Sequence, residues 1–258
     1  MKLTVLGGAA AGGNTGQGCS GYLVELDVTR LVLDLGPGTL PELRRHTDFR
    51  TLTAIVVSHL HLDHVLDLMA LRFALTYNPI RPSAPIPLWL PPGGLGFLRR
   101  AAAAFAEPGD ESAFFSRVFA VAEYDPTEPL TLGEATVTFA PTVHYVPCWA
   151  MRIAGGGAGN DLGYTADTGP TAFLTDLLNG VRVLIAEGTW LQAPPDSTES
   201  IGHLTVTEAA LLARTVGART LVLAHLWEET GFDASRDAAT AAFDGFVAVA
   251  RPGLCLAW

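Results

Sequence analysis

Apolar residues recur along the chain in short runs that predict strands in both halves, with helical spacing between several of them. These runs predict strands at residues 3–6, 22–27, 31–35, 53–57, 86–90, 117–122, 136–140, 148–154, 161–165, 181–186 and 220–224, and a closing strand pair that ends at Trp258. Apolar spacing and capping signals predict helices at residues 40–46, 65–76, 95–106, 171–178, 205–217 and 234–243. The short turn between 22–27 and 31–35 predicts a hairpin.

The order of these elements indicates how the chain is layered. Strand-rich segments and alternating helices and strands occur in both halves, which favours two sheets packed face to face with helices outside. No internal repeat or low-complexity linker separates the halves. We therefore predict a single α/β domain that spans residues 1–258.

Composition limits the location and the partners of the protein. The chain has 16 basic and 26 acidic residues and a net charge of −10, which argues against binding a large nucleic acid. Its cysteines, Cys19, Cys148 and Cys255, are too few and too scattered for a disulfide framework. The first residues are typical of a strand rather than a signal peptide, and no window of about 18 uninterrupted apolar residues occurs. We expect a cytoplasmic protein without a membrane partner.

A cluster of histidines follows the predicted strand at 53–57. Residues 58–64 read Ser-His-Leu-His-Leu-Asp-His, so His59, His61, Asp63 and His64 lie on one short loop before a helix. Neutral imidazole and carboxylate are suitable ligands for zinc, iron or manganese. The alternative is a solvated histidine-rich turn. Further polar residues at strand ends favour the metal site instead.

Four such residues stand where apolar strands stop, namely His144, Asp167, Glu187 and His225. A metal centre needs ligands that a rigid scaffold holds in place, and strand ends provide that. A single histidine at a strand end is more often a structural residue. Several strand-end residues together with the histidine loop are harder to explain in that way.

The spacing His59-x-His61-x-Asp63-His64, followed in order by His144, Asp167 and His225, resembles that of the metallo-β-lactamase superfamily over the whole chain. The resemblance implies a four-layer αββα sandwich of two mixed β-sheets flanked by helices. It also implies a hydrolase with two divalent ions, zinc or else manganese or iron, that share a hydroxide. One ion would be held by His59, His61 and His144, the second by Asp63, His64 and His225, with Asp167 between them. Seven ligands exceed what one tetrahedral ion accepts.

Two further segments resemble the ribonuclease Z-like phosphodiesterase branch of that superfamily. They are Glu187-Gly188-Thr189 and Gly202-His203-Leu204-Thr205, which depart from the usual Glu-Ala-Thr and His-Ser-Thr forms at the glycine and the leucine. The resemblance implies that Glu187 orients His203, which protonates the leaving oxygen or steadies the phosphoryl oxygens. Asp63, Glu187 and His203 are therefore the predicted catalytic residues. Alternatively, His203 only caps the helix that opens at Thr205.

The substrate class is narrowed by spacing and charge. Asp167 follows His144 by only 23 positions, which leaves no room for the protruding arm of bacterial transfer-RNA processors. A small phosphodiester is the predicted substrate, because the short spacings resemble small bacterial members similar to cyclic nucleotide phosphodiesterases. The alternatives are a thioester or lactone hydrolase, ribonuclease Z-like RNA processing, and a binding module without activity. A homodimer is expected from the resemblance alone.

Three other features leave alternatives open. Trp149, Trp190 and Trp227 each lie within five residues of a predicted site residue and either form an aromatic wall for a nucleobase or pack in the core. The glycine-rich segment 7–18 matches no phosphate-binding pattern and is interpreted as a flexible turn near the site. The proline-rich segment 78–96 forms a rim or dimer contact, or a plain surface loop.

Overall fold

Antiparallel strands form one side of each sheet, and parallel strands joined by helices form the other side. The computed structural model describes residues 1–155, 157–193 and 202–258. In the first sheet the strand order is β14-β1-β2-β3-β4-β5-β6, antiparallel from β14 to β3 and parallel from β3 to β6. The strands are β1 (Lys2–Gly7), β2 (Gly21–Leu26), β3 (Thr29–Leu35), β4 (Ala54–Val56), β5 (Ile86–Leu90), β6 (Phe119–Glu123) and β14 (Cys255–Ala257).

The second sheet repeats this plan. Its order is β13-β12-β11-β10-β9-β8-β7, antiparallel from β7 to β10 and parallel from β10 to β13. The strands are β7 (Leu130–Leu132), β8 (Ala135–Pro141), β9 (Trp149–Ala154), β10 (Leu162–Tyr164), β11 (Val183–Glu187), β12 (Thr220–Ala224) and β13 (Phe246–Val249).

Apolar side chains on both faces of the strands make three cores. In β3, Leu31 and Leu33 belong to the core between the sheets, and Val32 belongs to the core beneath the helices of the first sheet. In β11, Ile185 points between the sheets and Leu184 points to the helices of the second sheet. Because successive strand residues face opposite sides, strands buried on both faces need near-continuous apolar runs.

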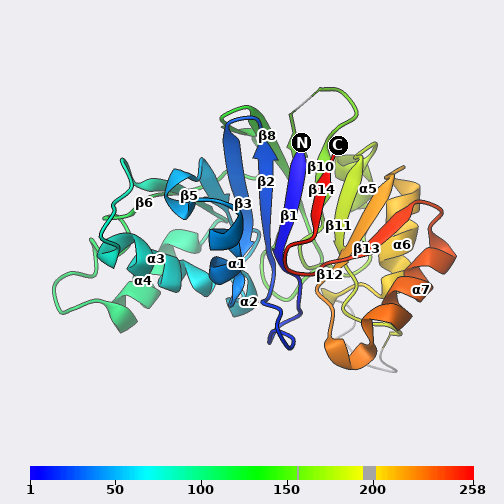
Figure 1. Ribbon diagram of the computed structural model, residues 1–258, viewed down its shortest axis with the longest axis horizontal. Coiled ribbons are helices and arrows are strands. Elements are labelled where there is room, and N and C mark those ends of the chain that lie inside the picture. Colours follow the sequence, from blue (N-terminus) through cyan, green and yellow to red (C-terminus); the bar gives the residue numbers. More distant parts are fainter. Residues whose placement is uncertain (156, 194–201) are drawn as a thin grey trace.

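Helices cover the outer faces of the two sheets, so the molecule has four layers (Figure 1). The helices are α1 (Thr39–His46), α2 (Leu62–Val65), α3 (Asp67–Tyr77), α4 (Gly94–Phe105), α5 (Phe173–Leu178), α6 (Val206–Thr215) and α7 (Phe232–Ala242). Residues of α1, α3 and α4 pack on the first sheet, and residues of α5, α6 and α7 pack on the second. The predicted αββα sandwich is confirmed. Within the described residues, no helix is long and apolar enough to cross a membrane.

Some local predictions are wrong. The helix predicted at 65–76 starts earlier, as α2, and is interrupted at Leu66 before α3. The predicted closing strand pair is not a pair, because β13 joins β12 while β14 crosses to the other sheet and joins β1. This crossing covers the open edge of β1 and brings the two termini together (Figure 1), with the Met1 ammonium donating to the Trp258 carbonyl at 2.7 Å. The short strand β7 was not predicted.

The loop after β3 packs directly against the main chain of the histidine segment at residues 58–64. A Cβ on Gly36 would overlap the carbonyl oxygen of Asp63 and meet the Cβ of Cys19 at 2.9 Å. The same loop leads into α1, whose N-cap residue Gly38 has no side chain that could accept a hydrogen bond from the first amides of the helix. Asp67 of α3 provides this acceptor instead, and the Leu40 amide donates to its carboxylate at 2.8 Å. The histidine segment and the loop after β3 therefore pack without spare space.

We expect Gly36→Ala to lower the free energy of unfolding by about 1–3 kcal/mol, because the added methyl group must push the Asp63 backbone aside. Urea unfolding followed by circular dichroism measures this change. Gly96→Ala is the matched control, since a Cβ there meets only arginine side-chain ends at 3.6 and 3.9 Å inside α4. The control should stabilise by roughly 0.5–1 kcal/mol. Equal stability of the two variants would contradict the close packing.

Candidate metal centre

The histidine segment leaves β4 in an extended conformation and turns into α2. His61 stands at the N-cap of α2 with extended backbone, and Asp63 and His64 lie in the only turn of that helix. His59 and His64 are fully buried, and Asp63 is 7% exposed. The change from extended loop to helix turns three imidazoles and one carboxylate toward the same side.

The remaining candidate ligands come from the second sheet, at the ends of its strands. His144 follows β8, Asp167 follows β10 and His225 follows β12. Ala166 and His225 have positive φ angles of 50° and 55°, a region that residues other than glycine rarely adopt. Such strained backbone persists only where the surroundings hold it, and it is concentrated at functional sites.

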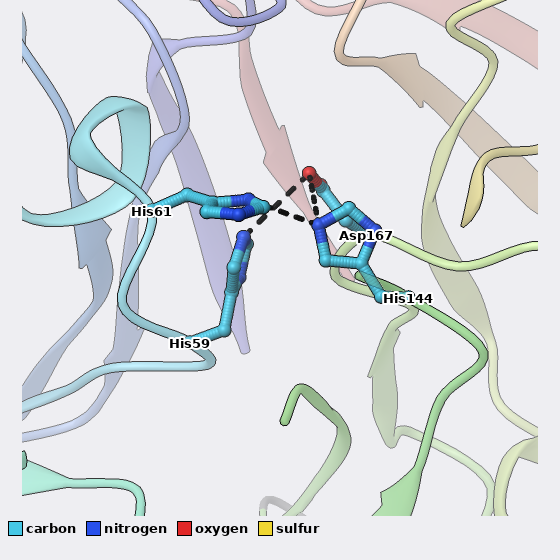
Figure 2. A group of neighbouring side chains, drawn as sticks. All are labelled: His59, His61, His144 and Asp167. Atoms are coloured by element: carbon cyan, nitrogen blue, oxygen red, sulfur yellow. Dashed lines mark hydrogen bonds and ion pairs between the residues drawn. The ribbon is translucent and has the colours of Figure 1, made fainter. Parts of the chain in front are cut away.

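The structure brings all seven predicted ligands together in two groups. His59, His61, His144 and Asp167 form the first group, whose side chains point toward one another (Figure 2). The second group contains Asp63, His64, Asp167 and His225. Within each group the candidate ligand atoms lie within 4.8 Å of one another. Asp167 belongs to both groups, so its carboxylate could contact an ion held in either one.

Distances around Asp167 show how closely the groups converge. Its Oδ2 lies 3.7 Å from Nε2 of His59 and from Nε2 of His144, and its Oδ1 lies 3.3 Å from Nε2 of His64. Nε2 of His225 is 3.4 Å from Asp167 Oδ2 and 3.1 Å from Asp63 Oδ2. The Nε2 atoms of these four histidines therefore lie around the carboxylates of Asp63 and Asp167.

A buried carboxylate of the first sheet, Asp34, orients two of these histidines. Its Oδ2 accepts from His64 Nδ1 at 2.7 Å and from the Tyr164 hydroxyl at 2.6 Å. The Ser58 hydroxyl donates to Asp34 Oδ2 at 2.7 Å. The Ser58 oxygen can therefore accept a hydrogen bond from His59 Nδ1, which lies 3.0 Å away. With Nδ1 occupied in both rings, Nε2 points inward as the available ligand atom.

Glu187, at the end of β11, has the same role in the second sheet. The Thr189 hydroxyl donates to Glu187 Oε2 at 2.6 Å and accepts from His225 Nδ1 at 2.7 Å. His203 Nδ1 lies 3.0 Å from Glu187 Oε1, which also accepts from the Thr168 amide at 2.6 Å. Glu187, His203 and His225 are close enough to be a third metal-binding group, but these hydrogen bonds already occupy their facing atoms.

Burial and charge set the protonation of the site. Burial holds the pKa of His59 well below its usual range and lowers the pKa of His144 to about 4, so both imidazoles are neutral at pH 7. Burial opposes ionisation of Asp63, but the His225 hydrogen bond and neighbouring imidazoles outweigh it and lower its pKa to about 2. Burial likewise disfavours charge on His64, yet Asp167 and Asp34 raise its pKa.

These groups fit a divalent cation. Among the described residues, Nε2 of His59 and Nε2 of His64 are buried polar atoms without a hydrogen-bond partner. Such orphaned atoms are rare in folded proteins, and a bound ion can satisfy them in place of a hydrogen bond. Neutral imidazoles and ionised carboxylates are also the forms that bind metals, and a dication displaces a proton from a histidine such as His64.

Comparison with known proteins assigns the chain to a family. Residues 29–226 match the Beta-lactamase superfamily domain, a range that includes all seven candidate ligands. The chain belongs to the β-lactamase superfamily. It is 34% identical to the uncharacterized protein Rv1339 of Mycobacterium tuberculosis over 246 residues. This alignment covers 95% of this chain and 88% of that protein.

Two other superfamily members are similar over nearly the full length. The probable metallo-hydrolase YhfI of Bacillus subtilis is 30% identical over 257 residues, 98% of each chain. The crystal structure of YhfI superposes with a TM-score of 0.84 over 99% of each chain, at 27% identity. Ribonuclease Z of Haloarcula marismortui is 26% identical over 303 aligned positions, which cover 98% of this chain and 96% of that protein. Membership of this superfamily, with its metallo-hydrolases, supports a hydrolase.

Several residues at the superfamily site were not predicted from the sequence. Asp34, Ser58 and Thr189 touch candidate ligands, but in the sequence they lack any metal-binding pattern. His203 does not cap α6, because Thr205 and Glu208 form the capping box of that helix. Of the predicted aromatic wall, Trp149 packs against the core between the sheets, whereas Trp190 lines a pocket beside His203.

We expect removal of divalent metal with a chelator to lower Tm, and zinc to restore it, because an ion bound only by the folded state stabilises that state. At a hundredfold excess over Kd the gain is about 2.7 kcal/mol, which corresponds to roughly 5–10 °C for a chain of this size. Calcium is the control, since it prefers six to eight oxygen ligands. Identical melting with zinc, calcium and chelator would contradict a metal centre.

Proposed function

We propose that this chain is a metal-dependent phosphodiesterase that cleaves a small phosphodiester such as a cyclic nucleotide. The observation that carries the proposal is the position of His203, held by Glu187 beside the two candidate metal groups. In the proposal, His59, His61 and His144 hold one divalent ion, Asp63, His64 and His225 hold the other, and Asp167 contacts both. Zinc suits these donors best, and manganese or iron are alternatives.

Two bound ions would supply a water of lowered pKa and positive charge for the phosphoryl oxygens. In the proposal, His203 supplies the proton that the departing alkoxide oxygen needs. Glu187 accepts from Nδ1 of His203, which fixes the ring and leaves Nε2 to deliver a proton to the departing alkoxide oxygen. A thioester depends less on such a proton donor, because a thiolate is a better leaving group than an alkoxide.

A pocket of about 340 Å³ adjoins His203 and would receive the rest of the substrate. Its lining mixes apolar, hydroxyl and acidic side chains from Val143, Pro170, Trp190, Ala193, His203, Thr205 and Glu208. Pockets for small ligands have volumes of roughly 300–1,000 Å³. The pocket is therefore large enough for a mononucleotide, whereas the net charge of −10 disfavours a long polyanion.

RNA processing is the second candidate, favoured by the similarity to a ribonuclease Z. Against it, β9 and β10 fill the described part of the segment between His144 and Asp167, where no protruding arm is present. The net charge of −10 also disfavours a large polyanion. Turnover of a precursor transfer RNA that is faster than turnover of a cyclic nucleotide would support this alternative.

We also propose that the protein forms a homodimer and is located in the cytoplasm.

In the proposed complex, Tyr145 would contact a nucleobase. Its side chain is 53% exposed, and its ring centroid lies 5.1 Å from that of His144 and 5.9 Å from that of His203. A Cβ on Gly202 would come within 2.6 Å of the ring, so glycine at 202 makes room for it. Exposed aromatic rings beside a reaction centre are suitable platforms for stacking bases.

Variants of two proposed catalytic residues should separate metal binding from proton transfer. We expect Asp63→Ala to abolish hydrolysis of bis(4-nitrophenyl) phosphate, because it removes a metal ligand. We expect His203→Ala to slow turnover of cyclic AMP by about 10²–10⁴-fold while bound zinc is unchanged. His46→Ala is the control, since His46 bonds to Glu42 on α1 and is the one histidine outside the site. Full activity of the Asp63 and His203 variants would refute the mechanism.

The stacking role of Tyr145 predicts a selective change in substrate binding. Tyr145→Ala should raise KM for a cyclic nucleotide roughly 5- to 100-fold with little change in kcat, because base stacking contributes about 1–3 kcal/mol. Tyr145→Phe should retain wild-type KM. Tyr77→Ala removes a tyrosine that is 69% exposed at the end of α3 and serves as the control. If Tyr145→Ala behaves like this control, Tyr145 does not contact the base.

A further inference from the structure

The glycine-rich segment between β1 and β2 is not a free loop, because it is bonded to the segment that follows His225. Asn14 and Gln17 exchange main-chain hydrogen bonds at 3.0 Å and close a tight turn at its tip. The Gln17 side chain then donates to the carbonyl of Ala250, at 2.7 Å, and anchors the base of the turn to the second half of the chain. The flexible turn predicted for residues 7–18 is therefore a structured hairpin.

The Asn14 side chain brackets Trp227. Its Nδ2 donates to the Leu226 carbonyl at 2.9 Å, and its Oδ1 accepts from the Glu228 amide at 3.1 Å. A single amide thus satisfies main-chain groups on both sides of one residue, and this fixes the path of the chain there. The next residue of the hairpin, Thr15, donates its amide and its hydroxyl to the Glu228 carboxylate, both at 2.9 Å.

Main-chain bonds continue this contact up to His225 itself. The Leu226 amide donates to the Gly8 carbonyl at 3.1 Å, and the Ala10 amide donates to the Leu226 carbonyl at 3.2 Å. Leu226 is therefore held on both its main-chain groups by residues more than 200 positions away in the sequence. Its neighbour His225 adopts a φ of 55°, which a non-glycine residue keeps only when the flanking chain is restrained.

His225 serves only one of the two candidate metal groups. It lies in the group with Asp63, His64 and Asp167, whereas the other group contains no residue from this part of the chain. A contact that fixes the segment after His225 therefore acts on one metal position and not on the other. Thr189 orients the His225 ring from the opposite side, through Nδ1.

We propose that the hairpin at 8–18 is an outer support of the second metal position and that Asn14 is its positioning residue. Asn14 acts through Leu226 and Glu228 on the backbone of His225, and it touches neither the metal nor the substrate. The proposal rests on the metal centre of the proposed function. It requires no particular substrate, so metal binding tests it without any assay of activity.

The test is a zinc titration of metal-free protein by calorimetry, with the stoichiometry read by native mass spectrometry. Wild-type protein should bind about two zinc ions per chain. Asn14→Ala should weaken one of the two by about 10- to 100-fold and leave the other unchanged, the range measured when outer partners of metal ligands are removed. Asn14→Asp should not restore the affinity, because the Leu226 carbonyl needs an N–H donor.

Two further variants keep the test decisive. Asn78→Ala removes an asparagine whose Oδ1 accepts from the Ile80 amide in an exposed turn, and it should bind both ions as wild type does. If Asn14→Ala does not fold, Thr15→Val removes one bond to Glu228 and should weaken the same ion more mildly. If Asn14→Ala binds both zinc ions as wild type does, or binds both equally more weakly, the proposal is overturned while the proposed function stands. If wild-type protein binds no zinc, both the proposal and the proposed function fail.

Discussion

Asp167 is a carboxylate buried among imidazoles, and the burial of these polar groups is the constraint on which the site depends. Asp167 is 2% exposed, and the rings of His59 and His64 that face it are fully buried. Taking such groups out of water is costly unless charges are paired and hydrogen bonds are made. Asp34 and Ser58 satisfy the outer nitrogen atoms of these rings, whereas the inner Nε2 atoms have no hydrogen-bond partner among the described residues. A divalent cation can satisfy those nitrogens and neutralise the carboxylates together, and the clusters are suited to bind one.

The two sheets solve the problem of orienting histidines in the same way. In each sheet a buried carboxylate bonds directly to one histidine and reaches a second histidine through a hydroxyl. Asp34 contacts His64 directly and His59 through Ser58. Glu187 contacts His203 directly and His225 through Thr189.

The difference between the two halves matters for chemistry. His59, His64 and His225 all belong to the candidate metal groups that contain Asp167, whereas His203 lies outside both of those groups. His203 is therefore the histidine of this set to which the proposed mechanism gives a role toward the substrate. The same arrangement of carboxylate, hydroxyl and imidazole therefore orients three candidate ligands and the proposed proton donor.

Local patterns predicted most strands and helices and the histidine loop, and the resemblance to the metallo-β-lactamase superfamily predicted the four layers and the convergence of the candidate ligands. Apolar runs mark strands that are buried on both faces, and the histidine spacing marks a single loop. Asp34, Thr189 and Asn14 were missed as supports, because their roles come from contacts with residues far away in the chain. The crossing of β14 to β1 was missed for the same reason, since its partner is at the other terminus. Tyr145 gained importance from its position beside His203, which no spacing in the sequence reveals.

The most direct test of the central claim is anomalous diffraction from crystals of zinc-loaded protein, recorded on both sides of the zinc absorption edge. The account predicts two peaks about 3.5–4 Å apart, one within each group, with the Asp167 carboxylate between them. A map with no peak beside Asp167, or with zinc only at surface residues, would contradict it.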